Sequence, residues 1–321
     1  MEEYQYKRFT RSLIVDFMQL HHRVFGVPID EEEVVAKFDT SKICQLEYIG
    51  YLAYDGKRPI GFYGVFPCWA QLGKDKFLCA QSGDTMTDPG YRGKGLFVKL
   101  ARLTYDLAKE EGVLFIFGFP NSNSFPGFAG KLNWLFLGHI QSFKGRVFTL
   151  PLAILAKKYK ILNSLYKRHC RFVFSKYKTN AAYFENSCTG SEHLTIIHDS
   201  SFFNYKQYFE KFIIKLGNYT MWVKIDGALF IGDIQGLNSH QVTSLSELKT
   251  LLASINKLAF FLGVNAIIIN TSPNTPLFDF FKGALKSKET LPIGYLPLRE
   301  NKDKAEIYSK LRFVGADFDT F

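Results

Sequence analysis

The apolar residues of the N-terminal part alternate between helical and strand-like spacing. Leu13, Phe17, Leu20 and Val24 recur every three or four residues, which predicts a helix over residues 11–26. The stretch closes on a glycine, as is common at helix C-termini. The same signals predict strands over residues 4–10, 45–56, 58–72 and 76–88, helices over 31–39 and 96–112, a buried strand over 113–120, and a short helix or turn over 124–134.

The C-terminal part repeats this order of elements. Its predicted elements are a hairpin over residues 219–237, a helix over 244–263, a buried strand over 264–272 and a short helix over 275–285. In both parts a Pro-Asn pair follows the buried strand, Pro120-Asn121 and Pro273-Asn274. We interpret this as a weak internal repeat, with chance recurrence as the alternative.

Hairpins combined with a helix between strands favour an α/β fold built on a mixed α+β sheet. The length of 321 residues is enough for two domains of ordinary size. We expect an N-terminal domain over residues 1–145, a basic amphipathic connector over 146–185, and a second α/β domain over 186–321.

The net charge of +10 is concentrated in one part of the chain. No Asp or Glu occurs between Gly112 and Phe184, whereas this stretch holds 11 Lys and Arg residues. Such a block predicts an anionic partner. Residues 150–178 are also amphipathic, which indicates peripheral contact with a membrane surface, and a solvated linker is the alternative. No recognised nucleic-acid-binding motif is present, so we expect no nucleic-acid partner.

The termini and cysteines indicate a cytoplasmic protein, at most peripheral at the inner membrane face. The start, MEEYQYKRFT, is charged from its second residue and lacks the apolar region of a signal peptide. No window has 18 uninterrupted apolar residues, so no transmembrane helix is expected. The five cysteines are scattered without Cys-x-x-Cys spacing, which predicts reduced thiols and no metal site.

The stretch DPGYRGKGLFVKLA, residues 88–101, predicts an anion-binding loop. Gly93 and Gly95 let successive backbone N–H groups point into one concavity, and the helix that follows adds the positive end of its dipole. Arg92 and Lys94 add charge at the rim. The known P-loop and dinucleotide-binding motifs are absent.

This stretch resembles the acyl-coenzyme A loop of the GNAT (GCN5-related N-acetyltransferase) superfamily. The superfamily pattern, Arg/Gln-x-x-Gly-x-Gly/Ala, is matched from Arg92 to Leu96, but Phe97 stands at the last position in place of Gly or Ala. KLNW at residues 131–134 also resembles a superfamily helix ending, with Asn133 in place of a glycine. Asn is the non-glycine residue that best tolerates a left-handed helix end. The resemblance covers residues 4–145.

The resemblance implies a site for acetyl-CoA as co-substrate. Backbone groups of Met86 and Thr87 would pair with the pantetheine arm, and Asn121 would contact CoA. The pyrophosphate would be held by the amides of Arg92, Gly93, Lys94, Gly95, Leu96 and Phe97. An amine would then attack the thioester directly, which requires a base, an oxyanion donor and an acid for the leaving thiol.

For the base, Asp84 is the first candidate because its strand runs into the glycine loop. Glu47, on an earlier predicted strand, is the second. The alternatives are a structural carboxylate at Asp84 and a solvent-facing side chain at Glu47. The tyrosine that often serves as the thiol acid in this superfamily is missing, because Ala129 stands there; water, Tyr63 or Tyr91 would have to replace it.

The expected function is N-acylation of a small-molecule amine or amino sugar, with a role in cell-envelope polysaccharide synthesis as an extrapolation. The second half has no counterpart of the glycine loop, so it resembles the degenerate copy of tandem acyltransferases. A non-catalytic acyl-CoA sensor and a basic module that binds nucleic acid or membrane are the alternatives. The C-terminal RFVGADFDTF would fold back to the acceptor pocket, or form a final strand with a frayed end.

Overall fold

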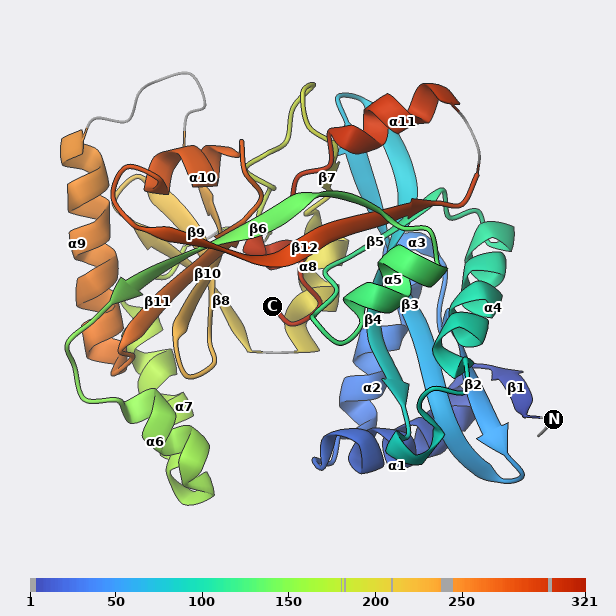
Figure 1. The fold of residues 1–321 in the computed structure, drawn as a ribbon. Coiled ribbons are helices and arrows are strands. Elements are labelled where there is room, and N and C mark those ends of the chain that lie inside the picture. Colours follow the sequence, from blue (N-terminus) through green and yellow to red (C-terminus); the bar gives the residue numbers. More distant parts are fainter. Residues whose placement is uncertain (1–3, 180, 182, 209, 238–244, 300–301) are drawn as a thin grey trace. The chain divides into compact units, whose positions relative to one another are not determined.

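The computed structural model describes residues 4–179, 181, 183–208, 210–237, 245–299 and 302–321 (Figure 1). The chain divides into two compact units. Unit 1 comprises Met1–Gly138, Asn204–Tyr208 and Leu291–Ser309. Unit 2 comprises His139–Phe203, Phe209–Thr290 and Lys310–Phe321. The predicted class, a mixed α/β fold, is confirmed.

Unit 1 is built on a mixed sheet with the strand order β1-β2-β3-β4-β5-β12. These strands are β1 (Gln5–Arg8), β2 (Gly50–Asp55), β3 (Arg58–Leu72), β4 (Asp75–Thr87), β5 (Phe115–Gly118) and β12 (Ser287–Pro297). Neighbours are antiparallel except β4 and β5, which are parallel. The helix between β4 and β5 makes this parallel pairing possible.

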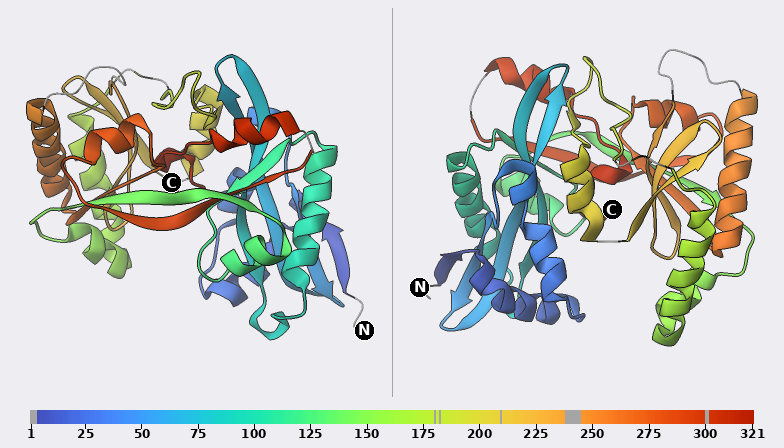
Figure 2. Two further views of the ribbon diagram at one scale, coloured as in Figure 1. Left: turned by 45° about the horizontal axis from the view of Figure 1, so that its top comes forward. Right: turned by 180° about the vertical axis from the view of Figure 1, so that it is seen from behind.

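Helices cover both faces of the unit 1 sheet (Figures 1 and 2). One face carries α1 (Ile14–Phe25) and α2 (Glu31–Phe38), whose buried residues form a phenylalanine-rich core with Phe62 of β3. The other face carries α4 (Leu96–Glu110) and α5 (Phe125–Lys131), which pack on Tyr63 and Val65. The remaining unit 1 elements are η1 (Arg11–Leu13), α3 (Ser41–Cys44), η2 (Pro89–Tyr91), η3 (Lys206–Tyr208) and α11 (Lys302–Ser309).

The strands of unit 2 follow the order β6-β11-β10-β9-β8, again with mixed parallel and antiparallel pairing. Its strands are β6 (Leu135–Arg146), β8 (Lys211–Leu216), β9 (Tyr219–Ile225), β10 (Leu229–Gln235) and β11 (Ala266–Thr271). Its other elements are α6 (Leu152–Lys158), α7 (Lys160–Ser175), β7 (Thr195–Ile196), α8 (Ser200–Tyr205), α9 (Leu245–Leu262), α10 (Pro276–Phe281) and η4 (Gly315–Asp317). The start of the predicted helix 244–263 lies outside the described residues.

The two halves of the sequence follow the same order: hairpin, long helix, buried parallel strand, short helix and final long strand. The final strands are exchanged between the units. β6 follows α5 in the sequence but pairs with β11, whereas β12 follows α10 but pairs with β5. Neither long strand was predicted from the sequence. Their sequences, LFLGHIQSFKGR and SKETLPIGYLP, show no clear alternation of apolar and polar residues.

Local sequence signals predicted most other elements to within a few residues. Asn133 has φ 55°, so the expected left-handed residue after α5 is confirmed. The basic amphipathic stretch over residues 150–174 forms two helices, α6 and α7, which meet at the extended residue Tyr159. The C-terminus neither frays nor forms a final strand, because η4 and the buried Phe321 pack in unit 2.

Asp88 fixes the turn that joins β4 to α4. Its Oδ2 accepts hydrogen bonds from Arg23 Nε of α1 at 3.1 Å and from Arg58 of β3 at 2.9 Å. Its Oδ1 accepts one from the Gly90 N–H at 3.1 Å. Burial alone would raise the pKa of Asp88, but these hydrogen bonds and the charge of Arg58 lower it below the usual value. Asp88 therefore anchors the glycine loop as a carboxylate.

We predict that Asp88→Asn lowers the free energy of unfolding by about 2 kcal/mol at pH 7, because charge-assisted hydrogen bonds are lost. The folded-state pKa is depressed, so the carboxylate stabilises the fold above its unfolded pKa of about 3.9 and loses this effect as the pH falls through the folded value. The gap between wild type and variant, measured by urea denaturation, should therefore close in acid. The exposed Asp106→Asn on α4 is the control. An equal loss at pH 3 and pH 7 would contradict the assignment.

Candidate active site

β4 and β5 separate after three residue pairs. Their parallel ladder runs from Cys79–Phe115 to Gln81–Phe117, and β5 ends one residue later at Gly118. β4 continues to Thr87, paired on its other edge with β3. Beyond Gln81, the edge of β4 that faces away from β3 has no strand neighbour among the described residues. We call this opening the splay.

A β-bulge lies in β4 at the splay. Gly64 pairs with Gly83 and Phe62 with Met86, so Tyr63 alone faces two residues of β4, Asp84 and Thr85. Asp84 has φ 50°, a left-handed conformation that Asp tolerates better than most residues. The extra residue reverses the alternation of side chains. Ala80 before the bulge packs in the core under α4, whereas Met86 after it packs in the core under α1 and α2.

The glycine loop has the open surface that an anion site needs. Gly93 has φ 80° and Gly95 has φ 78°, and both are exposed. A Cβ on either glycine would meet no other atom within 4 Å. The first N–H groups of this 15-residue helix, like those of any helix, have no intrahelical acceptor. Gly95, the N-cap of α4, has no side chain that could accept hydrogen bonds from them. The loop therefore presents backbone donors and the positive helix end to its surroundings.

The side chains next to the glycine loop pack or form hydrogen bonds around it, and they leave Gly93 and Gly95 exposed. Arg92 is exposed, and Lys94 Nζ donates to Tyr4 Oη at 3.0 Å while lying 5.0 Å from the Tyr91 ring centroid. Leu96 is buried under the sheet. The Tyr91 hydroxyl donates to Asp55 Oδ2 at 2.6 Å, which raises the pKa of Tyr91 and occupies its proton.

Phe97, which departs from the superfamily pattern, is accommodated by a glycine. Its ring packs edge-on against Phe128 of α5 at 5.2 Å between centroids, and lies 5.7 Å from the Tyr63 ring. A Cβ on Gly127 would lie 2.6 Å from the Phe97 ring. The missing side chain at Gly127 thus makes room for the large one at Phe97.

Asp84 forms an ion pair with Lys37 of α2. Both carboxylate oxygens lie 2.7 Å from Lys37 Nζ, and the two side chains are 21% and 10% exposed. Tyr205 donates to the Lys37 carbonyl at 2.8 Å, which adds to the fixation of this turn of α2. Asp84 therefore projects toward the α2 side of the splay as a partly buried carboxylate.

Glu33, which the sequence analysis missed, belongs to the same cluster. It lies one helical turn before Lys37, and burial is the largest cause of its raised pKa. The charge of Lys37 lowers this pKa, and the charge of Asp84 raises it. The spacing of Glu33 and Lys37, four residues apart on a helix, was the available signal. The ion pair of Lys37 with Asp84, and the influence of the Asp84 charge on Glu33, join residues too far apart in the sequence to be predicted.

A buried hydrogen-bond chain ends at Ser82 on the opposite side of the bulge. Trp134 Nε1 donates to Tyr105 Oη at 3.0 Å, Tyr105 and Tyr63 hydroxyls lie 2.8 Å apart, and Tyr63 Oη lies 2.7 Å from Ser82 Oγ. Burial raises the pKa of Tyr63 well above its usual value, so its proton stays in place. Ser82 itself is half-buried and is the first β4 residue beyond the β5 ladder.

The hydroxyl protons of this chain can be arranged in two directions. An indole N–H can only donate, so Trp134 donates to Tyr105. Either Tyr105 donates to Tyr63 and Tyr63 to Ser82, or Ser82 donates to Tyr63 and Tyr63 to Tyr105. In the first arrangement the Ser82 proton is available to a group outside the chain. Hydrogen bonds aligned in this way strengthen one another.

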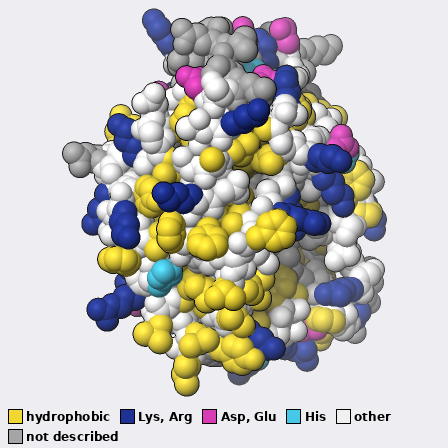
Figure 3. Space-filling view, turned by 90° about the vertical axis from the view of Figure 1, so that its left-hand side faces the viewer, with side chains coloured by type: hydrophobic (Ala, Val, Ile, Leu, Met, Phe, Trp, Pro, Cys, Tyr) yellow, Lys and Arg dark blue, Asp and Glu magenta, His cyan; other side chains and the backbone are white. Residues whose placement is uncertain are grey.

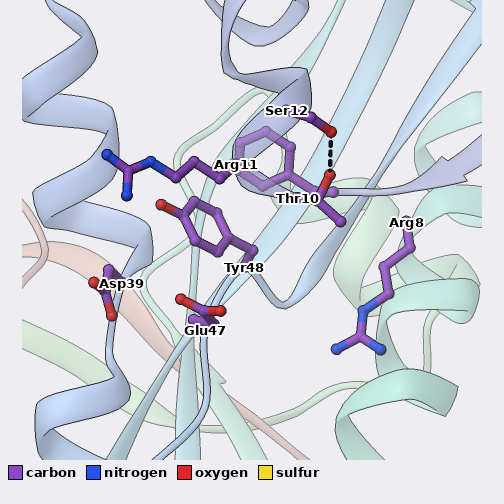
Figure 4. Close-up of a pocket in the computed structure, with 8 residues that line it drawn as sticks. Arg8, Thr10, Arg11, Ser12, Asp39, Glu47 and Tyr48 are labelled. Carbon is purple, nitrogen blue, oxygen red and sulfur yellow. Dashed lines mark hydrogen bonds between the residues drawn. The ribbon is translucent and has the colours of Figure 1, made fainter.

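Glu47 lies elsewhere. It was expected on a strand, but it is exposed in the segment before β2 begins at Gly50. It lines a surface depression of about 490 Å³ together with Arg11, Asp39 and Tyr48 (Figure 4). The structure does not bring Glu47 together with the glycine loop in any contact among the described residues.

The other residues predicted to contact CoA, Met86, Thr87 and Asn121, differ in which of their groups are exposed to a ligand. The Met86 side chain is buried and Thr87 is half-buried, so at Met86 only the backbone is available to a ligand. Asn121 is exposed, but its Oδ1 accepts hydrogen bonds from the N–H groups of Asn123 and Ser124 at 2.9 and 3.1 Å. Asn121 therefore shapes the turn that leads into α5.

Neither a metal site nor a membrane-spanning helix is found in the described part of the chain. No group of three or more His, Cys, Asp and Glu side chains there could hold a metal ion. None of the helices in the described ranges combines the length and apolar character needed to cross a bilayer.

Comparison with known structures identifies the fold. A GCN5-related N-acetyltransferase from Kribbella flavida aligns with a TM-score of 0.56 at 13% identity, over 92% of this chain and 72% of its own. One from Anabaena variabilis aligns with a TM-score of 0.50 at 12% identity, over 92% and 73%. A conserved protein of unknown function from Enterococcus faecalis scores 0.56 at 13% identity, over 92% and 73%.

Comparison with curated protein sequences finds no match. A family model described as an acetyltransferase (GNAT) domain matches residues 5–136, which contain the splay, the glycine loop, Asp84 and Ser82. This domain supports an acyltransferase. Residues 5–136 of this chain form an acetyltransferase domain of the GNAT family.

Proposed function

We propose that this protein transfers an acetyl group from acetyl-CoA to the amine of a small molecule or amino sugar. The observation that carries the proposal is the open glycine loop beside the splay of β4 and β5. A diphosphate at the loop would accept hydrogen bonds from the N–H groups of residues 92–97. It would also lie at the positive end of the α4 helix dipole. The pantetheine arm would follow the unpaired edge of β4, past Thr87 and Met86. Its thioester would then lie near the bulge.

Asp84 is the proposed base. In a GNAT reaction the amine nitrogen attacks the thioester carbon, the C–S bond breaks, and the ammonium proton must leave. Asp84 pairs with Lys37 Nζ at 2.7 Å in the cluster next to the bulge, so its carboxylate accepts hydrogen bonds from an ammonium group there. Glu33 has a raised pKa in the same cluster and is the competing candidate.

Ser82 is the proposed donor to the leaving thiolate. We propose that Tyr63 donates its hydrogen bond to Ser82 Oγ, 2.7 Å away, which leaves the Ser82 proton for a group in the splay. This supplies a donor in place of the tyrosine that Ala129 replaces. The buried chain behind Ser82 fixes the hydroxyl before the reaction begins, so little reorganisation is needed.

The second half is proposed to be a degenerate copy that does not bind CoA. Its β10 also carries a bulge, at Gly232, where the parallel pairing with β11 ends. The C-terminal segment fills this position: Val314 pairs with Thr271, and a Cβ on Gly232 would collide with the Phe321 ring. An acceptor linked to cell-envelope polysaccharide would suit the basic segment over 144–178.

We expect acetyl-CoA at 100 times its dissociation constant to stabilise the protein by about 2.7 kcal/mol. The double variant Gly93→Val, Gly95→Val should lose this thermal shift, since β-branched residues are strained at positive φ. The control is Gly90→Ala in the same turn, whose Cβ would make only an ordinary 3.7 Å contact with Asp88. Retention of the full shift by the double variant would exclude the loop as the diphosphate site.

Asp84→Asn should lower kcat by about 100-fold, in the range of general base catalysis, and leave the acetyl-CoA thermal shift intact. Asn tolerates the left-handed backbone, so the fold should persist. Thiol release with a panel of amino sugars and polyamines measures turnover. Glu33→Gln is the matched variant, because it removes the other carboxylate near Lys37. If Glu33→Gln alone abolishes turnover, Glu33 is the base and the assignment to Asp84 is wrong.

Ser82→Ala should lower kcat by about tenfold, the effect of one lost hydrogen bond to a developing charge, with little change in KM for acetyl-CoA. Ser82→Thr keeps the hydroxyl and should restore much of the rate. Tyr63→Phe removes the donor behind Ser82 and should act in the same direction. Wild-type kcat in Ser82→Ala would show that the leaving thiolate is stabilised by another group.

A further inference from the structure

One face of α7 in unit 2 is apolar and exposed. Ile161, Leu165 and Phe172 are 86%, 65% and 61% exposed, and Arg168 lies between them. Their spacing of four, three and four residues places all four on one side of the helix. The opposite side, with Cys170, Val173 and Phe174, is buried. The outer face of α7 thus exposes large side chains that an aqueous surface does not favour.

Two neighbouring segments extend this apolar surface. Phe148 and Leu150, in the segment before α6, are 93% and 74% exposed, and Phe260 and Phe261 at the end of α9 are about half exposed. Thr149 Oγ1 donates to the Phe260 carbonyl at 3.1 Å, so the loop touches the end of α9.

The end of α9 in turn contacts α7. Tyr166 Oη donates to the Leu262 carbonyl at 2.9 Å, and His169 Nε2 lies 2.7 Å from the Phe261 carbonyl. The three segments therefore form one continuous surface of unit 2. In Figure 3, which faces this side, hydrophobic side chains gather over the middle and lower part between Lys and Arg side chains.

The charge around this apolar surface is positive. No acidic residue occurs in residues 112–184, and the exposed cations of the segment include Lys158, Lys167, Arg168 and Lys176. Lys176 lies over the Phe172 ring at 4.8 Å, and Lys158 over the Tyr159 ring at 5.4 Å. Two further cations, Lys157 and Arg171, pair with Asp226 and Glu210.

We propose that the surface formed by residues 148–176 and Phe260–Phe261 docks on an anionic lipid bilayer. Aliphatic and aromatic side chains enter the interface, while the flexible stems of Lys and Arg let their charges reach lipid phosphates. A second copy of the chain fits this surface poorly, because two faces of the same positive charge would meet. The contact is peripheral and does not depend on acyl transfer.

Sedimentation of the full chain with vesicles tests this proposal. We expect binding to vesicles of phosphatidylcholine with 30% phosphatidylglycerol, and weak binding to phosphatidylcholine alone. Raising the salt should weaken the binding. Removing one cation should weaken partitioning on the order of fivefold. The set Lys167→Gln, Arg168→Gln, Lys176→Gln and the pair Ile161→Ser, Leu165→Ser should each bind far less than wild type.

Matched controls come from exposed residues of unit 1. Lys57→Gln with Lys76→Gln, and Val15→Ser, should bind vesicles as wild type does. The acetyl-CoA thermal shift, measured on every variant, reports an intact unit 1 and separates failure of docking from failure of the transferase assignment. Equal binding to neutral and anionic vesicles, or unchanged binding by both surface variants, would overturn the proposal. So would a dimer that the surface variants dissociate while wild type ignores vesicles.

Discussion

The single extra residue in β4 is the constraint on which the site depends. Without the bulge, residues 80, 82, 84 and 86 would all face the same side of the sheet. The left-handed Asp84 instead reverses the alternation, so Ser82 points to the tyrosine chain under α4 and Asp84 points to Lys37 of α2. A donor and a carboxylate thus reach the same opening from its two sides. The bulge also lies where β5 has ended, so the β4 backbone there is not committed to a neighbouring strand.

The two units show what filling such an opening does. Both contain a strand whose parallel pairing ends shortly before a bulge. In unit 1 the glycine loop and α4 follow, with open space around Gly93 and Gly95. In unit 2 the chain's own C-terminal residues occupy the equivalent place against Gly232. The same arrangement of strands is therefore compatible with a ligand site or with a closed core, and the side chains decide between them.

Sequence reasoning succeeded where the signal was local. The glycine loop, the left-handed Asn133 and the alternating helices and strands follow from residues close together in the chain. It failed where contacts join distant residues. Lys37 and Asp84 are 47 residues apart, and Tyr63 and Tyr105 are 42 apart, so neither pair has a spacing that periodicity can reveal. The exchange of β6 and β12 is hidden for the same reason. Phe97 departs from the motif, and the residue that accommodates it, Gly127, is 30 positions away in the sequence.

The most direct measurement is a crystal structure of the full chain with CoA. The account predicts the diphosphate within hydrogen-bond distance of the backbone nitrogens of residues 92–97, with the pantetheine arm along β4 and its sulfur near Ser82. A diphosphate bound at any other place, or a pantetheine arm that does not enter the opening between β4 and β5, would contradict it.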